Sequence, residues 1–260
     1  MLEKFIVCFI AGVGAGLGTG FAGMSAAAVI TPMLITFLKM DAYQAVGIAL
    51  ASDVLASAVS AYTYGKNKNI DIKNGITMLC TVLIFTIIGS FVSSLVPSNT
   101  MGNFSVFMTM LLGIKFIVKP VMTTKEKMMK IDEKKKYIQS IVFGSLIGFI
   151  CGFIGAGGGM MMLLTLTSVM GYELKTAVGT SVLIMTFTAL TGSISHFFLD
   201  GISDFTSLIF CIFSTLLWAR IAAKFANKAT PKTLNRITGV VLFILGVVII
   251  LANSLSENLM

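Results

Sequence analysis

The chain of 260 residues is 56% hydrophobic and only 12% charged, and its mean hydropathy is +0.95. A soluble domain of this size does not need so much apolar sequence, so the composition indicates a polytopic membrane protein in contact with lipid. The formal net charge of +8 does not indicate a nucleic-acid partner, because the lysines lie in short loops between apolar segments.

Each half of the chain contains five apolar segments, which we predict to be helices. In the first half they cover residues 5–22, 24–38, 44–63, 75–95 and 100–118. In the second half they cover residues 138–154, 158–170, 176–198, 205–223 and 234–253. A full membrane span needs about 20 residues, and the second segment of each half is shorter. The first two segments of each half therefore form either a re-entrant hairpin of half-helices or a short, tilted pair of crossing helices.

The two halves are related by a tandem duplication with an offset of about 132 residues. The register holds without a gap for about 55 residues, which chance matching of a few glycines does not explain. We predict two repeats, residues 1–118 and 138–260, joined by a basic cytoplasmic linker of residues 119–137. The matched positions include Gly16, Gly20, Phe21 and Gly23, which align with Gly148, Gly152, Phe153 and Gly155.

The first apolar segment also has a feature of signal peptides, because Lys4 precedes an apolar run. Cleavage would remove Gly16–Gly23, which the duplication includes. We therefore expect the segment to be retained in the protein.

Loop charge predicts the orientation of the chain in the plasma (inner) membrane. Lys115–Lys136 holds eight lysines, and Lys66–Lys73 and Lys224–Arg236 are two further basic stretches, so all three are predicted to be cytoplasmic. Counting segments outward places both termini outside, together with Pro97–Thr100 and the acidic loop Asp200–Asp204. Since five is an odd number, the predicted fold is an all-α polytopic membrane protein with two inverted-topology repeats containing glycine-broken or re-entrant half-helices.

A glycine-rich stretch precedes the short segment of the second half, with five glycines within Gly152–Gly159. Glycine is unfavourable inside a helix but allows positive φ angles and close backbone approach. We predict that free N–H groups at two opposed half-helix starts bind an anion. The residues concerned are Gly157, Gly158 and Gly159 in the second half and Ser25, Ala26 and Ala27 in the first. The alternative is that these small residues only permit close helix packing.

The third segment of each half carries a stripe of polar residues at helical spacing. In the second half Ser181, Thr188 and Ser195 recur every seven residues, and Thr180 adjoins Ser181. We predict that Thr180, Ser181 and Thr188 contribute to substrate binding, although hydroxyl groups in membrane helices often bond only to backbone. The corresponding stripe of the first half consists of Asp53, Ser57, Ser60 and Tyr64.

Two ionisable residues of the third segments are candidates for ion coupling. Asp53 lies in the middle of an apolar segment, where an aspartate costs about 2.5–3.5 kcal/mol on insertion scales and therefore needs a function or a partner. It either carries a coupled proton or coordinates a cation, or else makes a structural hydrogen bond to serines or unwound backbone. His196 either takes part in proton transfer or anion binding, or anchors a helix end at the membrane interface.

The pattern Gly155–Gly159, Ala177–Ser181 and His196 resembles the TauE/SafE family of sulfite-exporter-like membrane proteins, and Gly20–Gly23 with Pro32 and Asp41–Gly47 looks like that family's first repeat. The resemblance covers nearly the whole chain. It implies a secondary transporter of small anions, with sulfite, sulfonates and related organosulfur compounds as substrates.

Other functions are less consistent with the sequence. An anion channel of the same architecture is the main alternative. An intramembrane serine hydrolase using Ser25 and His196 would lack the usual Gly-x-Ser-x-Gly motif, so no enzymatic activity is expected. No cofactor and no metal are expected either, because the four cysteines lie in apolar segments without ligand spacing, and Met160–Met162 is predicted to pack in the interior. The oligomeric state is left open, with a homodimer as one alternative.

Overall fold

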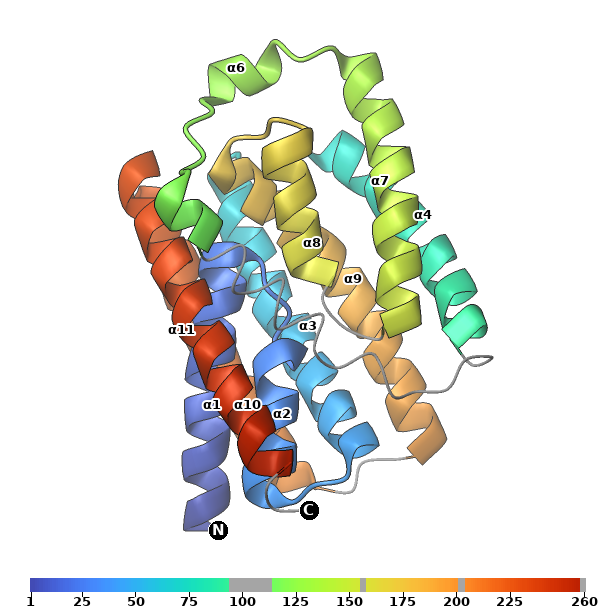
Figure 1. Ribbon diagram of the computed structural model, residues 1–260, viewed down its shortest axis with the longest axis vertical. Helices are drawn as coiled ribbons and strands as arrows, with labels where there is room; N and C mark the ends of the chain where they lie inside the picture. The colour runs from blue at the N-terminus through green and yellow to red at the C-terminus, as the bar shows by residue number, and fades with distance from the viewer. Residues whose placement is uncertain (94–113, 155–157, 201–203, 258–260) are drawn as a thin grey trace.

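The computed structural model describes residues 1–93, 114–154, 158–200 and 204–257 (Figure 1). These residues form a bundle of helices, and no β-strand occurs among them. The helices of the first half are α1 (Leu2–Ala22), α2 (Ala27–Leu38), α3 (Ala42–Lys66) and α4 (Ile72–Ser93). A short helix α6 (Lys125–Met129) lies in the linker. The second half contains α7 (Glu133–Ile154), α8 (Gly158–Leu164), the π-helical turn η1 (Thr165–Val169), α9 (Leu174–Asp200), α10 (Phe205–Lys228) and α11 (Pro231–Glu257).

The helices agree with the predicted segments to within a few residues. Six of the described helices are long and apolar enough to cross a membrane: α1, α3, α4, α9, α10 and α11. The α2 helix and the combined α8–η1 segment are shorter, as predicted. The first two segments of the first half are not two half-helices, because α1 is full-length and only α2 is short. The fifth predicted segment, residues 100–118, lies mostly outside the described residues.

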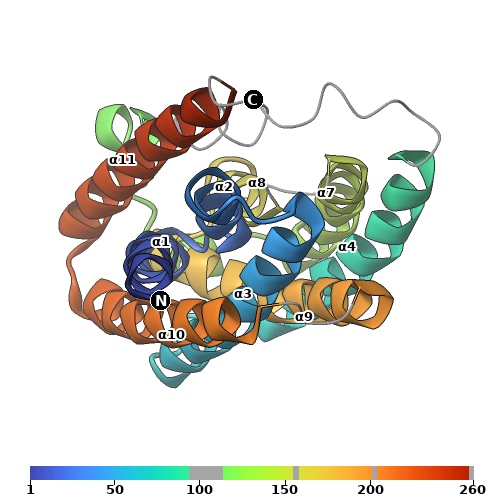
Figure 2. The same cartoon turned by 90° about the horizontal axis from the view of Figure 1, so that it is seen from below.

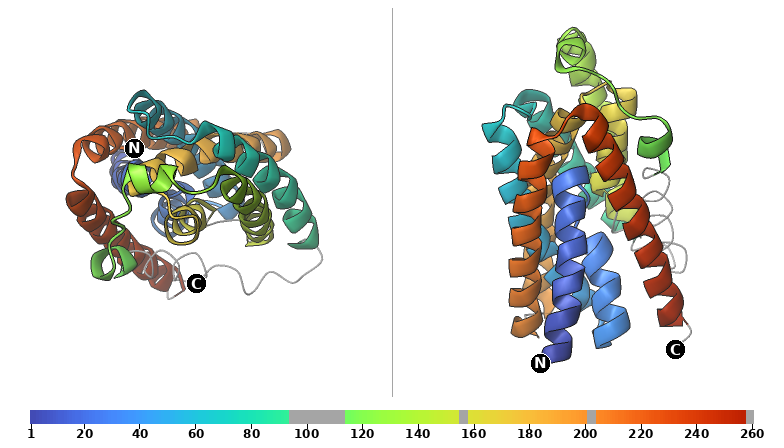
Figure 3. Two further views of the ribbon diagram at one scale, coloured as in Figure 1. Left: turned by 90° about the horizontal axis from the view of Figure 1, so that it is seen from above. Right: turned by 90° about the vertical axis from the view of Figure 1, so that its left-hand side faces the viewer.

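The termini and the basic loops lie at opposite ends of the bundle. The N- and C-termini lie at one end, whereas the α3–α4 turn, α6 and the α10–α11 turn lie at the other, which we call the basic end (Figures 1 and 3). At the basic end the Nζ atom of Lys73 lies 3.6 Å from a carboxylate oxygen of Glu133. At the opposite end Lys4 and Asp204 form an ion pair of 2.6 Å. The three predicted cytoplasmic loops are thus brought to one end of the bundle, and their cytoplasmic location stays a prediction.

The first helix of each half packs closely on a helix of the other half (Figure 2). Glycines permit both contacts, because a Cβ atom at Gly16 would lie 2.6 Å from the carbonyl oxygen of Thr215 on α10. In the same way, a Cβ atom at Gly148 on α7 would overlap with the backbone of Val82 on α4. Small residues at such contacts let two helix backbones approach each other closely.

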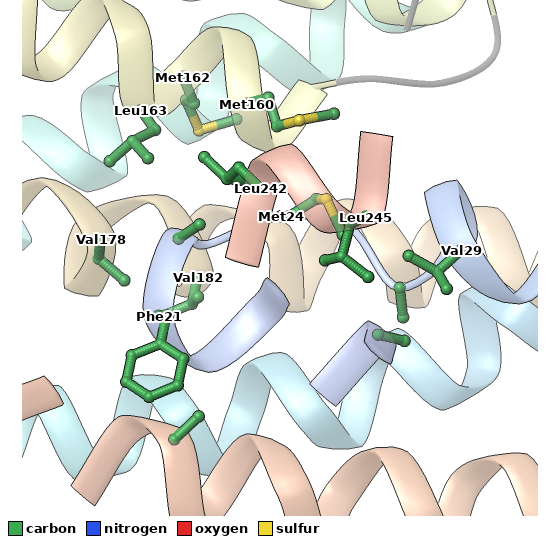
Figure 4. Packing of buried hydrophobic residues seen from close by; sticks show 14 of the residues in the cluster. Phe21, Met24, Val29, Met160, Met162, Leu163, Val178, Val182, Leu242 and Leu245 are labelled. Carbon is green, nitrogen blue, oxygen red and sulfur yellow. The ribbon is translucent and has the colours of Figure 1, made fainter. Parts of the chain in front are cut away.

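Both halves also contribute to the buried apolar cluster in the middle of the bundle (Figure 4). Met160 and Met162 of α8 lie there near Leu242 of α11 and Met24 beside α2. Each of the two α8 methionines is 1% exposed. The predicted packing role of these methionines is confirmed.

Candidate functional site

The polypeptide between α1 and α2 forms a sharp break at Gly23. This residue has φ +60°, a left-handed conformation that glycine adopts without a steric penalty. Its N–H group donates to the Thr19 carbonyl (2.9 Å), and the N–H of Met24 donates to the Gly18 carbonyl (3.2 Å). This is the Schellman-type arrangement that commonly ends a helix. A Cβ atom at position 23 would overlap with Ser181 Oγ, so the break lies directly against α9.

Side chains from distant helices satisfy the last carbonyl groups of α1. The hydroxyl of Tyr64 on α3 donates to the Gly20 carbonyl (2.9 Å), and that of Thr238 on α11 donates to the Phe21 carbonyl (3.2 Å). Carbonyls in the last turn of a helix have no partner inside that helix, and leaving them unpaired away from water is costly. Hydrogen bonds from α3 and α11 therefore stabilise the end of α1 at the break.

The start of α2 is occupied by the carboxylate of Asp53, which is 1% exposed. The hydroxyl of Ser25 donates to Asp53 Oδ2 (2.7 Å), and the hydroxyl of Ser57 donates to Oδ1 (2.9 Å). A third hydrogen bond comes from the backbone N–H of Ala26. The carboxylate thus stands where an anion is expected at the N-terminus of a helix. The predicted alternative, in which Asp53 is held by structural hydrogen bonds to serines or to backbone, is present, with the carboxylate as the acceptor.

The predicted polar stripe on α3 is buried along its whole length. Asp53, Ser57, Ser60 and Tyr64 are each at most 1% exposed. The hydroxyl oxygen of Ser60 has no hydrogen-bond partner among the residues that the structure describes. A buried hydroxyl group without a partner is unusual in a folded protein.

A second helix break lies between the end of α7 and the start of α8, and α8 begins next to the break at Gly23 inside the bundle. α7 ends at Ile154 and α8 begins at Gly158, while Gly157 lies outside the described residues. A Cβ atom at Gly159 would overlap with the Gly23 carbonyl oxygen and would lie 3.2 Å from the Ser25 backbone nitrogen. Close packing between the two breaks therefore accounts for glycine at position 159. The same contact brings the starts of α2 and α8 together, as the anion-site hypothesis requires.

The two breaks differ in the residue of the third segment that faces them. Asp53 faces the start of α2, whereas the residue that corresponds to it in the duplication is Met185. The sulfur atom of Met185 would lie 2.5 Å from a Cβ atom at Gly159, so this side chain faces the start of α8. Only one of these two corresponding positions therefore carries a carboxylate.

The remaining predicted site residues lie at different distances from the breaks. Ser181 is buried beside Gly23, and its hydroxyl donates to the Val178 carbonyl of its own helix (2.9 Å). The Thr188 hydroxyl donates to the Met185 carbonyl (3.2 Å). Thr180 does not face the break, because its hydroxyl accepts a bond from the Asp71 backbone at the basic end (3.1 Å). His196 belongs to α9, and its side chain lies outside the described residues. Ala27 was predicted to lie at the start of α2, and its N–H donates to Ser25 Oγ (3.3 Å).

Two residues at the breaks were not identified from the sequence. Thr238 and Met185 were missed, because each is an ordinary residue within an apolar segment and carries no local signal. The duplication could have indicated Met185 as the counterpart of Asp53. Among the described residues, no group of three or more His, Cys, Asp or Glu side chains could hold a metal ion.

The fold and the paired breaks define a multi-helix membrane protein whose interrupted helices meet in its interior. A family model described as "Sulfite exporter TauE/SafE" matches residues 8–249, and the chain belongs to this family of membrane transporters. The predicted resemblance is thereby confirmed.

Similar proteins of the family come from distant organisms. The probable membrane transporter protein YunE of Bacillus subtilis is 24% identical over 94% of this chain and 96% of its own length. A probable membrane transporter protein of Methanocaldococcus jannaschii is 27% identical over 95% of this chain and 94% of its own length. The alignments cover nearly complete chains, so the similarity extends over both halves.

Proposed function

We propose that the protein is a secondary transporter that moves small anions across the plasma membrane in an ion-coupled manner. Sulfite, sulfonates and related organosulfur compounds are the proposed substrates, in keeping with the family description. The observation that carries the proposal is the meeting of the two breaks, where Gly159 lies on Gly23 and Ser25. Interrupted helices at such positions supply binding groups for small ions in other secondary transporters.

The proposed substrate site consists of the two half-helix starts, with Ser25, Ala26 and Ala27 on one side and Gly157, Gly158 and Gly159 on the other. One helix terminus stabilises an anion by only about 0.3–1 kcal/mol, or ~2 kcal/mol when partly buried. Removing an ion from water costs several kcal/mol. Direct hydrogen bonds are therefore needed as well, and we assign them to backbone amides and to the hydroxyls of Ser181 and Thr188, which must turn away from the Val178 and Met185 carbonyls to donate to an anion. Thr180 is not included in the proposed site, because its hydroxyl is bonded to Asp71 at the basic end.

Asp53 is the proposed coupling group, and its surroundings favour a proton over a metal cation. All three of its described hydrogen bonds are donated to the carboxylate, from Ser25, Ser57 and Ala26. The backbone N–H of Ala26 cannot ligate a metal ion, and the two serine hydroxyls would have to turn their protons away from the carboxylate to do so. Protonation of Asp53 removes a negative charge beside the breaks and so favours the entry of an anion. His196 is proposed as a second group on the proton path.

The inverted orientation of the two repeats is part of the proposal. Its support is the reciprocal packing of α1 on α10 and of α7 on α4 through the corresponding glycines Gly16 and Gly148. Both termini would lie outside, with the basic end in the cytoplasm. Carriers built from inverted repeats alternate between two such related conformations.

The experiment is uptake into proteoliposomes of labelled sulfite, sulfonates, thiosulfate and carboxylates, each with a pH gradient, a Na⁺ gradient or none. We expect saturable uptake of at least one sulfur oxyanion, accumulation driven by the pH gradient and counterflow of preloaded substrate. Ser25→Ala should raise the KM, whereas Thr186→Ala, a change of a backbone-bonded hydroxyl elsewhere on α9, should not. Uptake no greater than in empty liposomes would contradict the proposal, and flux without counterflow would indicate a channel.

A further inference from the structure

The α3–α4 turn is hydrogen-bonded to the second half of the chain at the basic end. The hydroxyl of Tyr172, just before α9, donates to Asp71 Oδ2 (2.7 Å). The backbone N–H of Asp71 donates to Thr180 Oγ1 (3.1 Å). Tyr172 is completely buried, and Thr180 is 1% exposed. Burial, together with the neighbouring Asp71 carboxylate, raises the pKa of Tyr172, so its hydroxyl keeps the proton that it donates.

A second group of contacts holds the same turn. The side-chain amide of Asn69 donates to Asn227 Oδ1 on α10 (2.7 Å). Lys125 of the linker donates to Asn69 Oδ1 (3.2 Å). A Cβ atom at Gly179 of α9 would overlap with the Asn69 carbonyl, so the turn lies tightly on that helix. We call Asn69, Asp71, Tyr172, Thr180 and Asn227 the polar latch.

The duplication places different side chains at the opposite end of the bundle. Met40 and Ile48 stand at the positions that correspond to Tyr172 and Thr180. Neither side chain can donate or accept the hydrogen bonds that fasten Asp71. The polar latch is therefore a property of the basic end and not a consequence of the duplicated fold.

The polar latch is connected to the breaks through two helices. Thr180 and Ser181 are consecutive residues of α9, and the first contacts Asp71 while the second contacts Gly23. On α3, the backbone carbonyl of Tyr64 accepts from the Asn69 N–H (2.9 Å), and its hydroxyl bonds to the end of α1. A displacement of α9 or α3 at the basic end thus moves residues that touch the breaks.

We propose that the polar latch is the gate on the basic side of the transporter, and that the present structure is the conformation closed to that side. Opening requires separation of Asp71 from Tyr172 and Thr180, which exposes Ser181 and the breaks to the basic side. Packed interfaces of this kind have two discrete arrangements, and a change that weakens one arrangement shifts the population to the other. The proposal rests on the protein being a carrier, but its test needs no substrate.

The test measures the accessibility of a single thiol from each side of the membrane. Ser181→Cys is introduced into a chain in which alanine replaces Cys8, Cys80, Cys151 and Cys211. Vesicles of both orientations are treated with a membrane-impermeant maleimide, and Lys130→Cys, in the turn after α6, marks the basic side. Tyr172→Phe should raise the ratio of labelling from the basic side to labelling from the opposite side by about ten-fold, because the lost hydrogen bond has a charged acceptor.

Matched variants separate gating from general loosening. Tyr137→Phe removes a hydroxyl from a half-exposed tyrosine on α7 at the same end and should leave the ratio unchanged. Thr180→Val should raise the ratio as Tyr172→Phe does, and it serves as the test if Tyr172→Phe does not fold. An unchanged ratio, including an equal rise of both labelling rates, would overturn the proposal. Failure of the transport assay alone would overturn the proposed substrate class and leave this result standing.

Discussion

Asp53 lies on α3 and Ser25 lies in the turn before α2, and the structure joins them through one hydrogen bond of 2.7 Å. The sequence identified Asp53 because a charged residue in an apolar segment is costly. It identified Ser25 for a different role, at a half-helix start. Bonding of Asp53 to a serine was a predicted alternative, but Ser25 could not be identified as the partner, because a residue of α3 and a residue in the turn before α2 share no local period.

Gly159 is the residue at which substitution should most directly disturb the contact between the breaks. Gly159→Ala should lower the free energy of unfolding by about 1–3 kcal/mol, because the new methyl group meets backbone that cannot move aside easily. Thermal unfolding in detergent measures this effect. Gly65→Ala is the control, since a Cβ atom there lies 3.4 Å from a flexible Ile70 side-chain atom. Equal unfolding temperatures for the two variants would show that the breaks are not packed as described.

At the scale of helices, the sequence predicted most of what the structure contains. The apolar segments, the shortness of α2 and α8–η1, and the interruption before each of them all follow from local composition. The full length of α1 was not predicted, because the shortness of the second segment left a re-entrant hairpin of half-helices and a crossing pair equally open. Gly16 and Gly20 of α1 pack against α10, which is a long-range contact that composition does not reveal.

The end of α1 depends on a hydroxyl from α3. Tyr64→Phe should destabilise the protein by about 1–3 kcal/mol, because the Gly20 carbonyl loses its described donor in a buried position. Chemical or thermal unfolding of the purified variant measures the change. Tyr62→Phe, at a tyrosine that is 71% exposed, should leave stability nearly unchanged. A Tyr64→Phe protein as stable as wild type would mean that the break does not need this bond.

The ion pair between α1 and the start of α10 should make stability depend on pH. Partial burial opposes the charge of Asp204, but hydrogen bonds from Lys4 and Ser207 outweigh it and hold the pKa of Asp204 below its usual range. A lowered pKa in the folded state gives stability that is present above the unfolded-state pKa and lost as the pH falls through the folded-state value. Asp204→Asn should therefore lower the unfolding temperature at neutral pH, and the difference should vanish in acid. If the two proteins differed in unfolding temperature by the same amount at neutral and at acid pH, the ion pair of Asp204 would not be the source of the pH dependence.

At the scale of the whole molecule, loop charge and the duplication predicted which loops share an end of the bundle. The basic stretches Lys66–Lys73, Lys115–Lys136 and Lys224–Arg236 lie at one end, and the termini lie at the other. The polar latch was not predicted, because Asp71 and Tyr172 are about 100 residues apart in sequence and belong to different repeats.

The orientation in the membrane is open to a direct test. Lys130→Cys should react with an impermeant maleimide only from the cytoplasmic side, because it belongs to the basic linker. Leu2→Cys, at the start of α1, should react only from outside. Each of the two substitutions is introduced into the chain without native cysteines, and maleimide labelling is measured in intact cells and in inverted vesicles. Labelling of both residues from the same side would exclude the predicted topology.

We propose that an anion crosses the membrane at the two breaks together with a proton held by Asp53. The most direct test compares pH-driven accumulation with counterflow of a transported sulfur oxyanion in proteoliposomes containing Asp53→Asn. Asparagine keeps the shape and hydrogen-bond acceptor of the side chain but cannot exchange a proton. We predict that counterflow persists and accumulation against a gradient disappears, whereas full pH-driven accumulation by Asp53→Asn would show that Asp53 is not the coupling group.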